Sequence, residues 1–262
     1  MKFQHVEHDK ALSPFVKSIM IFESNEISIK THLPFFADGF PGLIYQETPS
    51  GLYVNPHKKR MPPLFIYGQT IEPIEIEITG SYQMIAFQLY PFTLQALFNI
   101  DPKSINDNCY DLSLERTQVQ NNVTSALLAD NNPYSRVKLL SSYIVKLIEV
   151  KKNNFDAAIF SAINKILSAK GKCSLAETAK EVNLTKRTFE RRFSSETGLS
   201  PKQFAKIIQF QNSLTQLSIK DFSSLSDIVY QNGFADQSHF IRVFKSFTGK
   251  TPKQFVTDTE EH

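Results

Sequence analysis

Alternating hydrophobic and polar positions predict β-strands over most of the first 90 residues. The clearest alternation sets Ile74, Ile76 and Ile78 against Glu75 and Glu77, which is the period of two of a half-buried strand. Short apolar runs bounded by Pro or Gly predict further strands at 18–23, 27–32, 43–47, 52–54, 64–67 and 83–89. With little helix between them, these segments predict a small antiparallel β-barrel or β-sandwich.

The first clear hairpin signal follows the alternating strand. Thr79-Gly80-Ser81 predicts a turn, after which the chain returns with Ile85, Phe87 and Leu89 on one face.

A period near 3.6 predicts helices after residue 90, at 92–98, 113–130, 134–151 and 156–169. In the third, Val137, Leu140, Ile144 and Leu147 follow a 3-4-3 spacing that forms a heptad seam. Such a seam pairs two subunits into a homodimer or packs against the chain's own β-domain. The pattern leaves both uses open.

Two stretches near the C-terminus repeat each other. Residues 175–204 and 225–255 align with one extra residue in the second copy's turn, and their ends TGLSPKQF and TGKTPKQF nearly coincide. Each copy has a short amphipathic helix, a tight turn and a second helix with aromatic residues four apart, as in a helix-turn-helix unit. We expect Thr185 and Asp236 to cap the second helices, and a Gly-x-x-Pro run to end each one and begin the next.

A helical wheel of about 100° per residue places basic and polar residues of each second helix opposite its phenylalanines. The outward positions include Arg187 and Arg191 in the first copy and Ser238 and Arg242 in the second. Such a face suits the major groove, where Arg contacts guanine O6 and N7. One such helix also fits an ordinary solvated surface, but two in tandem with matching Arg residues favour DNA binding.

Four motifs extend this interpretation: T-x-x-x-F-x-R-x-F at 185–193, G-L-S-P at 198–201, N-G-F-A-D-Q-S-H-F-x-R-x-F-K at 232–245 and TGKTPKQF at 248–255. On these residues, the segment from about 155 to 256 resembles the DNA-binding domain of AraC-type transcriptional regulators. The resemblance implies two helix-turn-helix units joined by a long helix, here about 201–217. It also implies that their second helices enter successive major grooves of DNA.

The resemblance implies a role for particular residues. The base-reading positions would be Arg187, Glu190, Arg191, Ser238, His239 and Arg242. Glu190 and His239 rest on the resemblance alone, because the wheel sets them at the edges of the polar faces. The residues better suited to phosphate contacts, which position a protein without selecting sequence, are Lys186, Ser194, Gln237, Lys245, Lys202 and Lys253.

Two positions depart from the family pattern. The family usually has an Arg near the middle of the joining helix, where this chain has Gln209, and it usually ends Q-Y-R, where this chain has Gln254-Phe255-Val256. The first departure predicts a weaker fixed orientation between the two units. Neither departure falls on a base-reading position.

Charge is segregated along the chain in agreement with a C-terminal DNA-binding domain. Residues 155–257 hold 15 Lys and Arg against 8 Asp and Glu, a surplus of +7, whereas residues 1–154 hold 14 against 15. Counterion release on DNA should therefore come from the C-terminal part. With 262 residues, the chain also has room for a second domain.

Targeting and redox signals are few. No apolar run reaches the roughly 20 residues of a membrane span, and residues 1–20 lack a secretion-signal pattern. Cys109 and Cys173 do not suggest a disulfide framework and fit a reducing compartment. We expect a cytoplasmic protein without a membrane partner.

The first part of the chain is a candidate sensor. In the AraC-type resemblance this place is often held by a cupin-like β-barrel that binds a small molecule, and the segments ADGFPGLIYQ and PPLFIYGQT look similar to it. The aromatic residues expected at an effector pocket, with the first two at its mouth, are Phe35, Phe36, Tyr45, Phe65 and Tyr67. For each of them an ordinary place in the core is the alternative.

Catalytic signatures are missing from the sequence. Metal-dependent cupins need a His-x-His with further His and Glu ligands, whereas His5, His8, His32 and His57 form no such set. No nucleophile elbow, phosphate-binding loop or dinucleotide fingerprint occurs either. We expect no enzyme activity, no cofactor and no bound metal.

The sequence thus predicts an α+β protein of two domains. A sensor or dimerisation domain spans 1–153, with strands to about 90 and helices at 92–152, and a DNA-binding domain spans 154–262, with Asn153-Asn154 as the boundary. The function expected is a sequence-specific regulator of transcription, with double-stranded DNA, a small-molecule effector and RNA polymerase as partners. The alternative is a cupin-like enzyme or small-molecule binding protein that uses its helical end for assembly. We expect an activator, although the sequence itself does not distinguish activation from repression.

Overall fold

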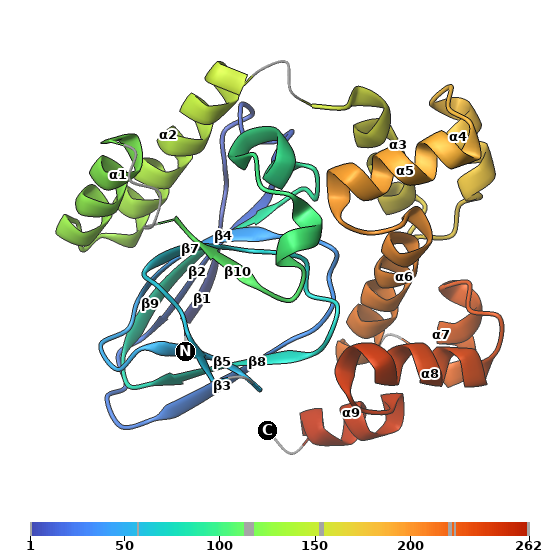
Figure 1. The fold of residues 1–262 in the computed structure, drawn as a ribbon. Helices are drawn as coiled ribbons and strands as arrows, with labels where there is room; N and C mark the ends of the chain where they lie inside the picture. The colour runs from blue at the N-terminus through green and yellow to red at the C-terminus, as the bar shows by residue number, and fades with distance from the viewer. Residues whose placement is uncertain are drawn as a thin grey trace. The chain divides into compact units, whose positions relative to one another are not determined.

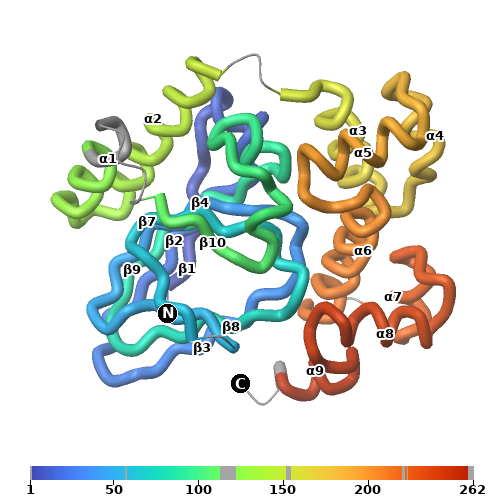
Figure 2. The backbone as a smooth tube through the Cα atoms, in the orientation of Figure 1, coloured from blue at the N-terminus to red at the C-terminus, as the bar shows by residue number. Residues whose placement is uncertain are grey.

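The computed structural model describes residues 2–56, 58–112, 118–151, 155–219, 222 and 224–260, apart from the side chains of 118–121 and 259–260. Two compact units form the chain (Figures 1 and 2). The first consists of Met1–Phe35, Phe40–Gln69 and Ile74–Phe155, and the second of Phe36–Gly39, Thr70–Pro73 and Asp156–His262. The expected boundary at Asn153-Asn154 lies outside the described residues.

Two antiparallel sheets form the strand part of the first unit (Figure 1). The six-stranded sheet has the order β1-β2-β9-β4-β7-β10, and its strands are β1 Lys2–Val6, β2 Val16–Ser24, β9 Tyr82–Leu89, β4 Gly42–Glu47, β7 Leu64–Tyr67 and β10 Cys109–Asp111. The four-stranded sheet has the order β3-β8-β5-β6, and its strands are β3 Lys30–Phe35, β8 Ile74–Thr79, β5 Leu52–Asn55 and β6 Lys59–Arg60. The sequence predicts a small antiparallel barrel or sandwich, and the two-sheet arrangement confirms the antiparallel β fold. Six of the seven expected strands match with small shifts in their ends, whereas the strand expected at 27–32 lies at Lys30–Phe35.

The connection between β8 and β9 differs from the expected return. β8 pairs with β3 and β5, whereas β9 pairs with β2 and β4, so the two strands belong to different sheets. Gly80, with φ of +84°, turns the chain from one sheet to the other. Burial explains why β9 lies inside the six-stranded sheet, between β2 and β4, and does not pair with β8. Met84 and Ala86 on one face of β9 and Ile85 and Phe87 on the other are all buried.

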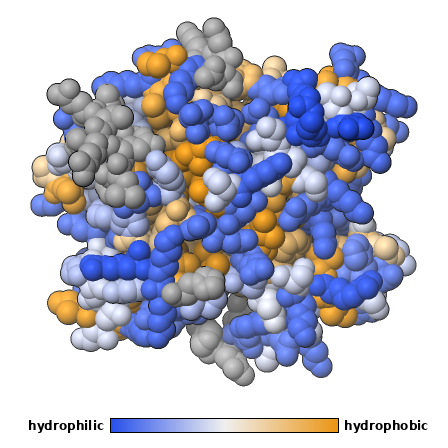
Figure 3. Space-filling view, viewed as in Figure 1, coloured by the Kyte–Doolittle hydropathy of each residue, from blue (hydrophilic) through white to orange (hydrophobic). Residues whose placement is uncertain are grey.

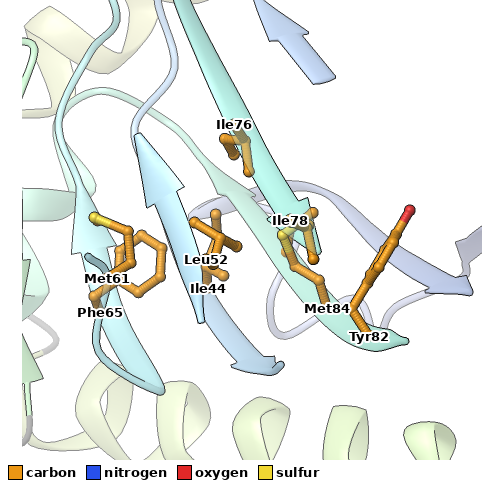
Figure 4. Packing of buried hydrophobic residues seen from close by; sticks show 9 residues of the cluster. Ile44, Leu52, Met61, Phe65, Ile76, Ile78, Tyr82 and Met84 are labelled. Atoms are coloured by element: carbon orange, nitrogen blue, oxygen red, sulfur yellow. The ribbon is translucent and has the colours of Figure 1, made fainter. Parts of the chain in front are cut away.

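A hydrophobic core joins the two sheets (Figure 4). Ile76 and Ile78 of β8 and Leu52 of β5 pack with Phe65 of β7 and Met84 of β9. Each of these side chains is at most 4% exposed, and burying one of that size contributes about 1.5–3 kcal/mol.

Among the residues that the structure describes, the helical segments that follow in the first unit are the π-helix η1 Leu94–Phe98, the 3-10 helix η2 Pro102–Ile105, α1 Gln118–Ala129 and α2 Pro133–Lys151. The expected helices at 92–98 and 134–151 are confirmed with small shifts in their ends, and 113–117 of the expected helix 113–130 lie outside the described residues.

The heptad seam of α2 is used inside the first unit. Val137, Leu140 and Ile144 are at most 6% exposed, and α2 packs against η1, α1 and β9. Three of the four seam residues thus take the second of the two expected uses, packing within their own unit, whereas Leu147 is half-buried. Pairing of two subunits through α2 stays a prediction.

The second unit is helical. Its helices are α3 Ala157–Ser168, α4 Leu175–Glu181, α5 Lys186–Thr197, α6 Pro201–Ser218, α7 Leu225–Gln231, α8 Gln237–Thr248 and α9 Pro252–Glu260. The long helix α6 runs between two short helix pairs, α4 with α5 and α7 with α8 (Figure 1).

Candidate nucleic-acid interface

The two helix pairs are copies of one backbone design. Asn183 in the first turn and Gly233 in the second are both left-handed, with φ of +56° and +73°. Leu184 N donates to Ala179 O at 2.9 Å, and the equivalent bond of the second turn has a length of 3.0 Å. The duplication read from the sequence is therefore a duplication of turn geometry, which can be followed along the tube in Figure 2.

Both expected caps are confirmed. Thr185 Oγ1 accepts a hydrogen bond from Thr188 N at 3.3 Å, and Asp236 Oδ1 accepts one from His239 N at 2.7 Å. These caps satisfy a first-turn amide of α5 and of α8, which the helix itself leaves without a partner. The helices end at Gly198 and Gly249, as expected from the Gly-x-x-Pro runs.

Aromatic packing fixes one face of each second helix. Phe189 and Phe193 of α5 are fully buried with ring centroids 5.6 Å apart. In α8, Phe240 and Phe244 lie 5.7 Å apart, and Phe244 also contacts Phe210 of α6 at 5.5 Å. The rotation of each helix about its own axis is thereby set, and with it the side chains that face outward.

The expected base-reading residues lie on the outward faces. The exposed members of that set are Arg187, Glu190, Arg191, Ser238 and Arg242. His239 is half-buried, with its ring 5.9 Å from that of Phe234, and its Nδ1 accepts from Ala235 N at 3.4 Å. Strongly hydrophilic atoms gather over α5 in the space-filling view (Figure 3).

The expected phosphate-contacting residues are also mostly exposed. The exposed members are Lys186, Lys202, Gln237, Lys245 and Lys253, and Ser194 is half-buried. Flexible lysines that flank the two reading helices can follow a phosphate backbone without a fixed geometry.

An ion pair between Arg192 of α5 and Asp156, the N-cap of α3, joins these two helices. The sequence did not predict this ion pair. Arg192 Nε and Nη2 lie 2.7 and 2.6 Å from Asp156 Oδ2, while Asp156 Oδ1 caps α3. Glu196 Oε2 is buried beside them without a hydrogen-bond partner. Burial, together with the Asp156 carboxylate and against the attraction of Arg192, raises the pKa of Glu196.

The five aromatic residues expected at an effector pocket are spread over the protein. Phe65 belongs to the core between the sheets, and Phe35 and Tyr67 pack against that core. Tyr45 is fully buried and donates to Leu127 O at 3.2 Å. Phe36 belongs to the second unit, where its ring lies 6.0 Å from that of Phe255.

A pocket of about 560 Å³ lies in the first unit, and none of those five residues lines it. It is lined by Gln46, Glu47, Thr48, Pro49, Gly51, Arg60, Met61, Pro62, Pro63, Asp111 and Leu128. Its size is that of small-molecule sites. One carboxylate on its wall, Glu47, is ion-paired at 2.6 Å to Arg136, whose side chain is 1% exposed.

Metal and membrane sites were sought as well. Over the described ranges, no group of three or more His, Cys, Asp or Glu side chains is arranged to hold a metal ion. Likewise, no helix among the described residues has the length and apolar character to cross a bilayer.

Two similar turns, two capped helices and two exposed arginine-bearing faces define a tandem helix-turn-helix domain of the DNA-binding class. Residues 178–258 match the family model described as a helix-turn-helix domain, and residues 4–111 match a domain of unknown function, DUF6597. Residues 178–258 therefore form an AraC-type helix-turn-helix domain.

Relatives resemble this chain over about a third of its length. An uncharacterized HTH-type transcriptional regulator of Staphylococcus aureus is 31% identical over 85 residues, which cover 32% of this chain and 11% of the relative. The HTH-type transcriptional activator RhaS of Yersinia pestis is 31% identical over 77 residues, which cover 29% of this chain and 28% of RhaS. The chain thus spans about a tenth of the length of the staphylococcal relatives it matches.

Two solved structures show the degree of overall likeness. ToxT from Vibrio cholerae is similar with a TM-score of 0.47 and 13% identity, over 90% of this chain and 97% of ToxT. A DNA-binding transcriptional dual regulator from Escherichia coli is similar with a TM-score of 0.37 and 20% identity, over 41% of this chain and 96% of that one.

Proposed function

We propose that the protein is a sequence-specific, DNA-binding regulator of transcription that responds to a small molecule bound by its first unit. The observation that carries the proposal is the matched pair of second helices. Each buries its phenylalanines and exposes Arg at the same place, Arg191 in α5 and Arg242 in α8.

The chemistry of the two faces supports sequence reading. A guanidinium donates two parallel hydrogen bonds to guanine O6 and N7, so Arg187, Arg191 and Arg242 suit guanines in the major groove. Ser238 and His239 in the first turn of α8 suit a base edge or a neighbouring phosphate. The surrounding lysines supply affinity that does not depend on sequence.

Sensing is assigned to the first unit. The pocket beside Glu47 has the volume for a small ligand and combines apolar side chains with a few charged ones, as binding sites commonly do. No catalytic role is proposed for it. Action in the cytoplasm fits a regulator that must reach DNA. Two further parts of the proposal are a homodimer that pairs through α2 and a contact with RNA polymerase.

Two steps test the DNA proposal. Bound fragments are first selected from a genomic library with the full-length protein, and the affinity for the consensus and for random duplex is then measured by fluorescence anisotropy at several salt concentrations. We expect Arg191→Ala and Arg242→Ala to cost about 1–3 kcal/mol on the consensus and to relax preference at one position each.

Lys245→Ala is the matched control on α8, since it removes one exposed cation from the same helix without touching a base-reading position. It should weaken all sequences alike and reduce the salt slope by about one. Equal losses on consensus and random duplex from either Arg change would refute direct reading. If the protein shows no DNA affinity that falls as salt rises, the alternative is favoured, in which the helical end serves assembly.

A further inference from the structure

A set of polar contacts in the second unit links the second turn to the rest of the domain. Asn232, which ends α7, is 3% exposed, and its Nδ2 donates to Gln216 Oε1 of α6 at 2.6 Å and to Ile228 O at 2.9 Å. Gln216 Nε2 in turn donates to Gln231 Oε1 at 2.5 Å. The joining helix is therefore bonded to both residues at the end of α7.

A third segment completes the set. Lys172, which precedes α4 of the first helix-turn-helix unit, donates from Nζ to Gln231 O at 2.8 Å. Its stem covers Gly233, where an added Cβ would lie 3.1 Å from Lys172 Cγ. Gly171 lies so close to α6 that a Cβ would fall 2.3 Å from Ala205 O. We call Lys172, Gln216, Gln231 and Asn232 the turn-anchoring cluster.

The cluster lies where the family pattern has been lost. Gln209 stands on α6 at the place of the usual arginine, and its Nε2 would lie 3.5 Å from a Cβ on Gly233. Considered alone, Gln209 predicts that the second helix-turn-helix unit, α7 with α8, is held loosely. The cluster instead supplies three directional bonds to the end of α7 from two separate segments, α6 and the residue before α4.

Apolar packing fixes which face of α8 is buried, but it sets the angle between α8 and α6 less sharply than hydrogen bonds do. Phe210 of α6 contacts Phe247 of α8 with centroids 5.0 Å apart. Packed helices tolerate a scatter of about 15–20° in their crossing angle, whereas a hydrogen bond to a buried amide requires a narrow range of distance and direction. Leaving Asn232 without its partner inside the unit would be costly, so the cluster selects one orientation of α7 and α8 on α6.

Resting on the proposed function, we infer that the turn-anchoring cluster sets the distance between the two DNA blocks that the protein recognises. Its members do not touch bases; they are positioning residues. They hold α8 at a fixed place relative to α5, so that the two helices meet blocks about one helical turn apart. Inserting one base pair rotates the second block by about 34° and moves it about 3.4 Å, which a rigid pair of helices does not follow.

The test uses the full-length protein and duplexes built on the selected consensus. One duplex has both blocks, one has the α8 block scrambled, and two have one or two base pairs inserted between the blocks. The α8 block is identified as the one at which Arg242→Ala relaxes preference. Affinities are measured by fluorescence anisotropy, and thermal unfolding verifies that each variant is folded.

We expect Gln216→Ala to lower the two-block over one-block affinity ratio about tenfold, with the one-block affinity unchanged. It should also reduce the penalty for a one-base-pair insertion by a similar factor. Thr215→Ala is the matched control, because Thr215 is exposed on the same helix and its Oγ1 bonds only to Gln211 O at 3.0 Å in its own helix. It should keep the wild-type ratio and spacing penalty.

Lys172→Met provides a second variant, which keeps the stem over Gly233 and removes only the Nζ donor. Comparing ratios cancels the general loss of one positive charge, so a lower ratio reports on orientation. A wild-type ratio and spacing penalty in both variants would overturn the inference while leaving the DNA proposal intact. Equal affinity of the wild type for consensus and random duplex would instead overturn the proposed function.

Discussion

The aspartate at the start of α8 gives a local test of how a reading helix is held. Asp236 Oδ1 accepts from His239 N at 2.7 Å, whereas Thr185 makes the equivalent bond in the first helix-turn-helix unit at 3.3 Å. Asp236→Ala removes this acceptor and also removes a negative charge from the positive end of the helix dipole. Ser238 and His239, in the turn that would loosen, are two of the proposed DNA contacts.

The loss of stability expected for Asp236→Ala has two contributions. Losing the cap lowers the stability of α8 by about 1 kcal/mol, and losing the favourable charge lowers it by a further 0.3–1 kcal/mol, roughly 1–2 kcal/mol together. Asp236→Asn keeps an acceptor and loses the charge alone, so it should cost about 0.3–1 kcal/mol. Thr185→Ala, with a neutral and longer bond, should cost about 0.5–1 kcal/mol.

Hydrogen exchange of the full-length protein measures this directly. A peptide covering Gln237–Thr248 should exchange about 5–30 times faster in Asp236→Ala. Asp236→Asn should fall between that variant and the wild type. Exchange of α8 at the wild-type rate in Asp236→Ala, or equal exchange in the Ala and Asn variants, would contradict the capping argument.

Three further predictions concern other parts of the protein. Arg136→Met should cost about 2–4 kcal/mol in urea unfolding, because the buried guanidinium bonds Leu127 O and Glu47; wild-type stability would exclude that role. Burial raises the pKa of Glu196 in the folded protein above that of an ordinary carboxyl group. The folded state is therefore destabilised relative to the unfolded state once the pH rises above the usual carboxyl pKa. Glu196→Gln should unfold at a higher temperature than the wild type at pH 7 and at a similar one at pH 4, and a lower temperature at pH 7 would refute this. Asn183→Ala should cost about 1 kcal/mol at its φ of +56°, whereas Asn183→Gly should be neutral or stabilising; equal unfolding free energies would refute strain.

Local signals predicted the helix-turn-helix units well. A cap such as Thr185 needs an amide three residues away, and a stop such as Gly198 needs only its own φ. The burial of Phe189 follows from helical periodicity. These features depend on a few neighbouring residues, which the sequence displays side by side, so the turns, caps and outward arginines could be predicted.

Features that depend on distant partners could not be predicted. The turn around Gly80 is visible in the sequence, but nothing local states that β8 and β9 join different sheets. Arg136 looks like a surface residue of α2, yet it is 1% exposed because Glu47, Gln83 and Leu127 O meet it from other elements. Only the finished packing supplies such partners.

The difference between local features and features that depend on distant partners also applies to the two properties of a tandem DNA-binding domain, its base preference and its spacing preference. Base preference depends on side chains such as Arg242, which are exposed and fixed by the helix that carries them. Spacing preference depends on the half-buried Gln216 and the buried Asn232, which are bonded to each other and act through the angle between helices. Arg242→Ala should therefore change which bases are preferred while keeping the preferred spacing, and Gln216→Ala should broaden the spacing while keeping the bases. Such opposite outcomes are expected only if orientation and reading are held by different residues.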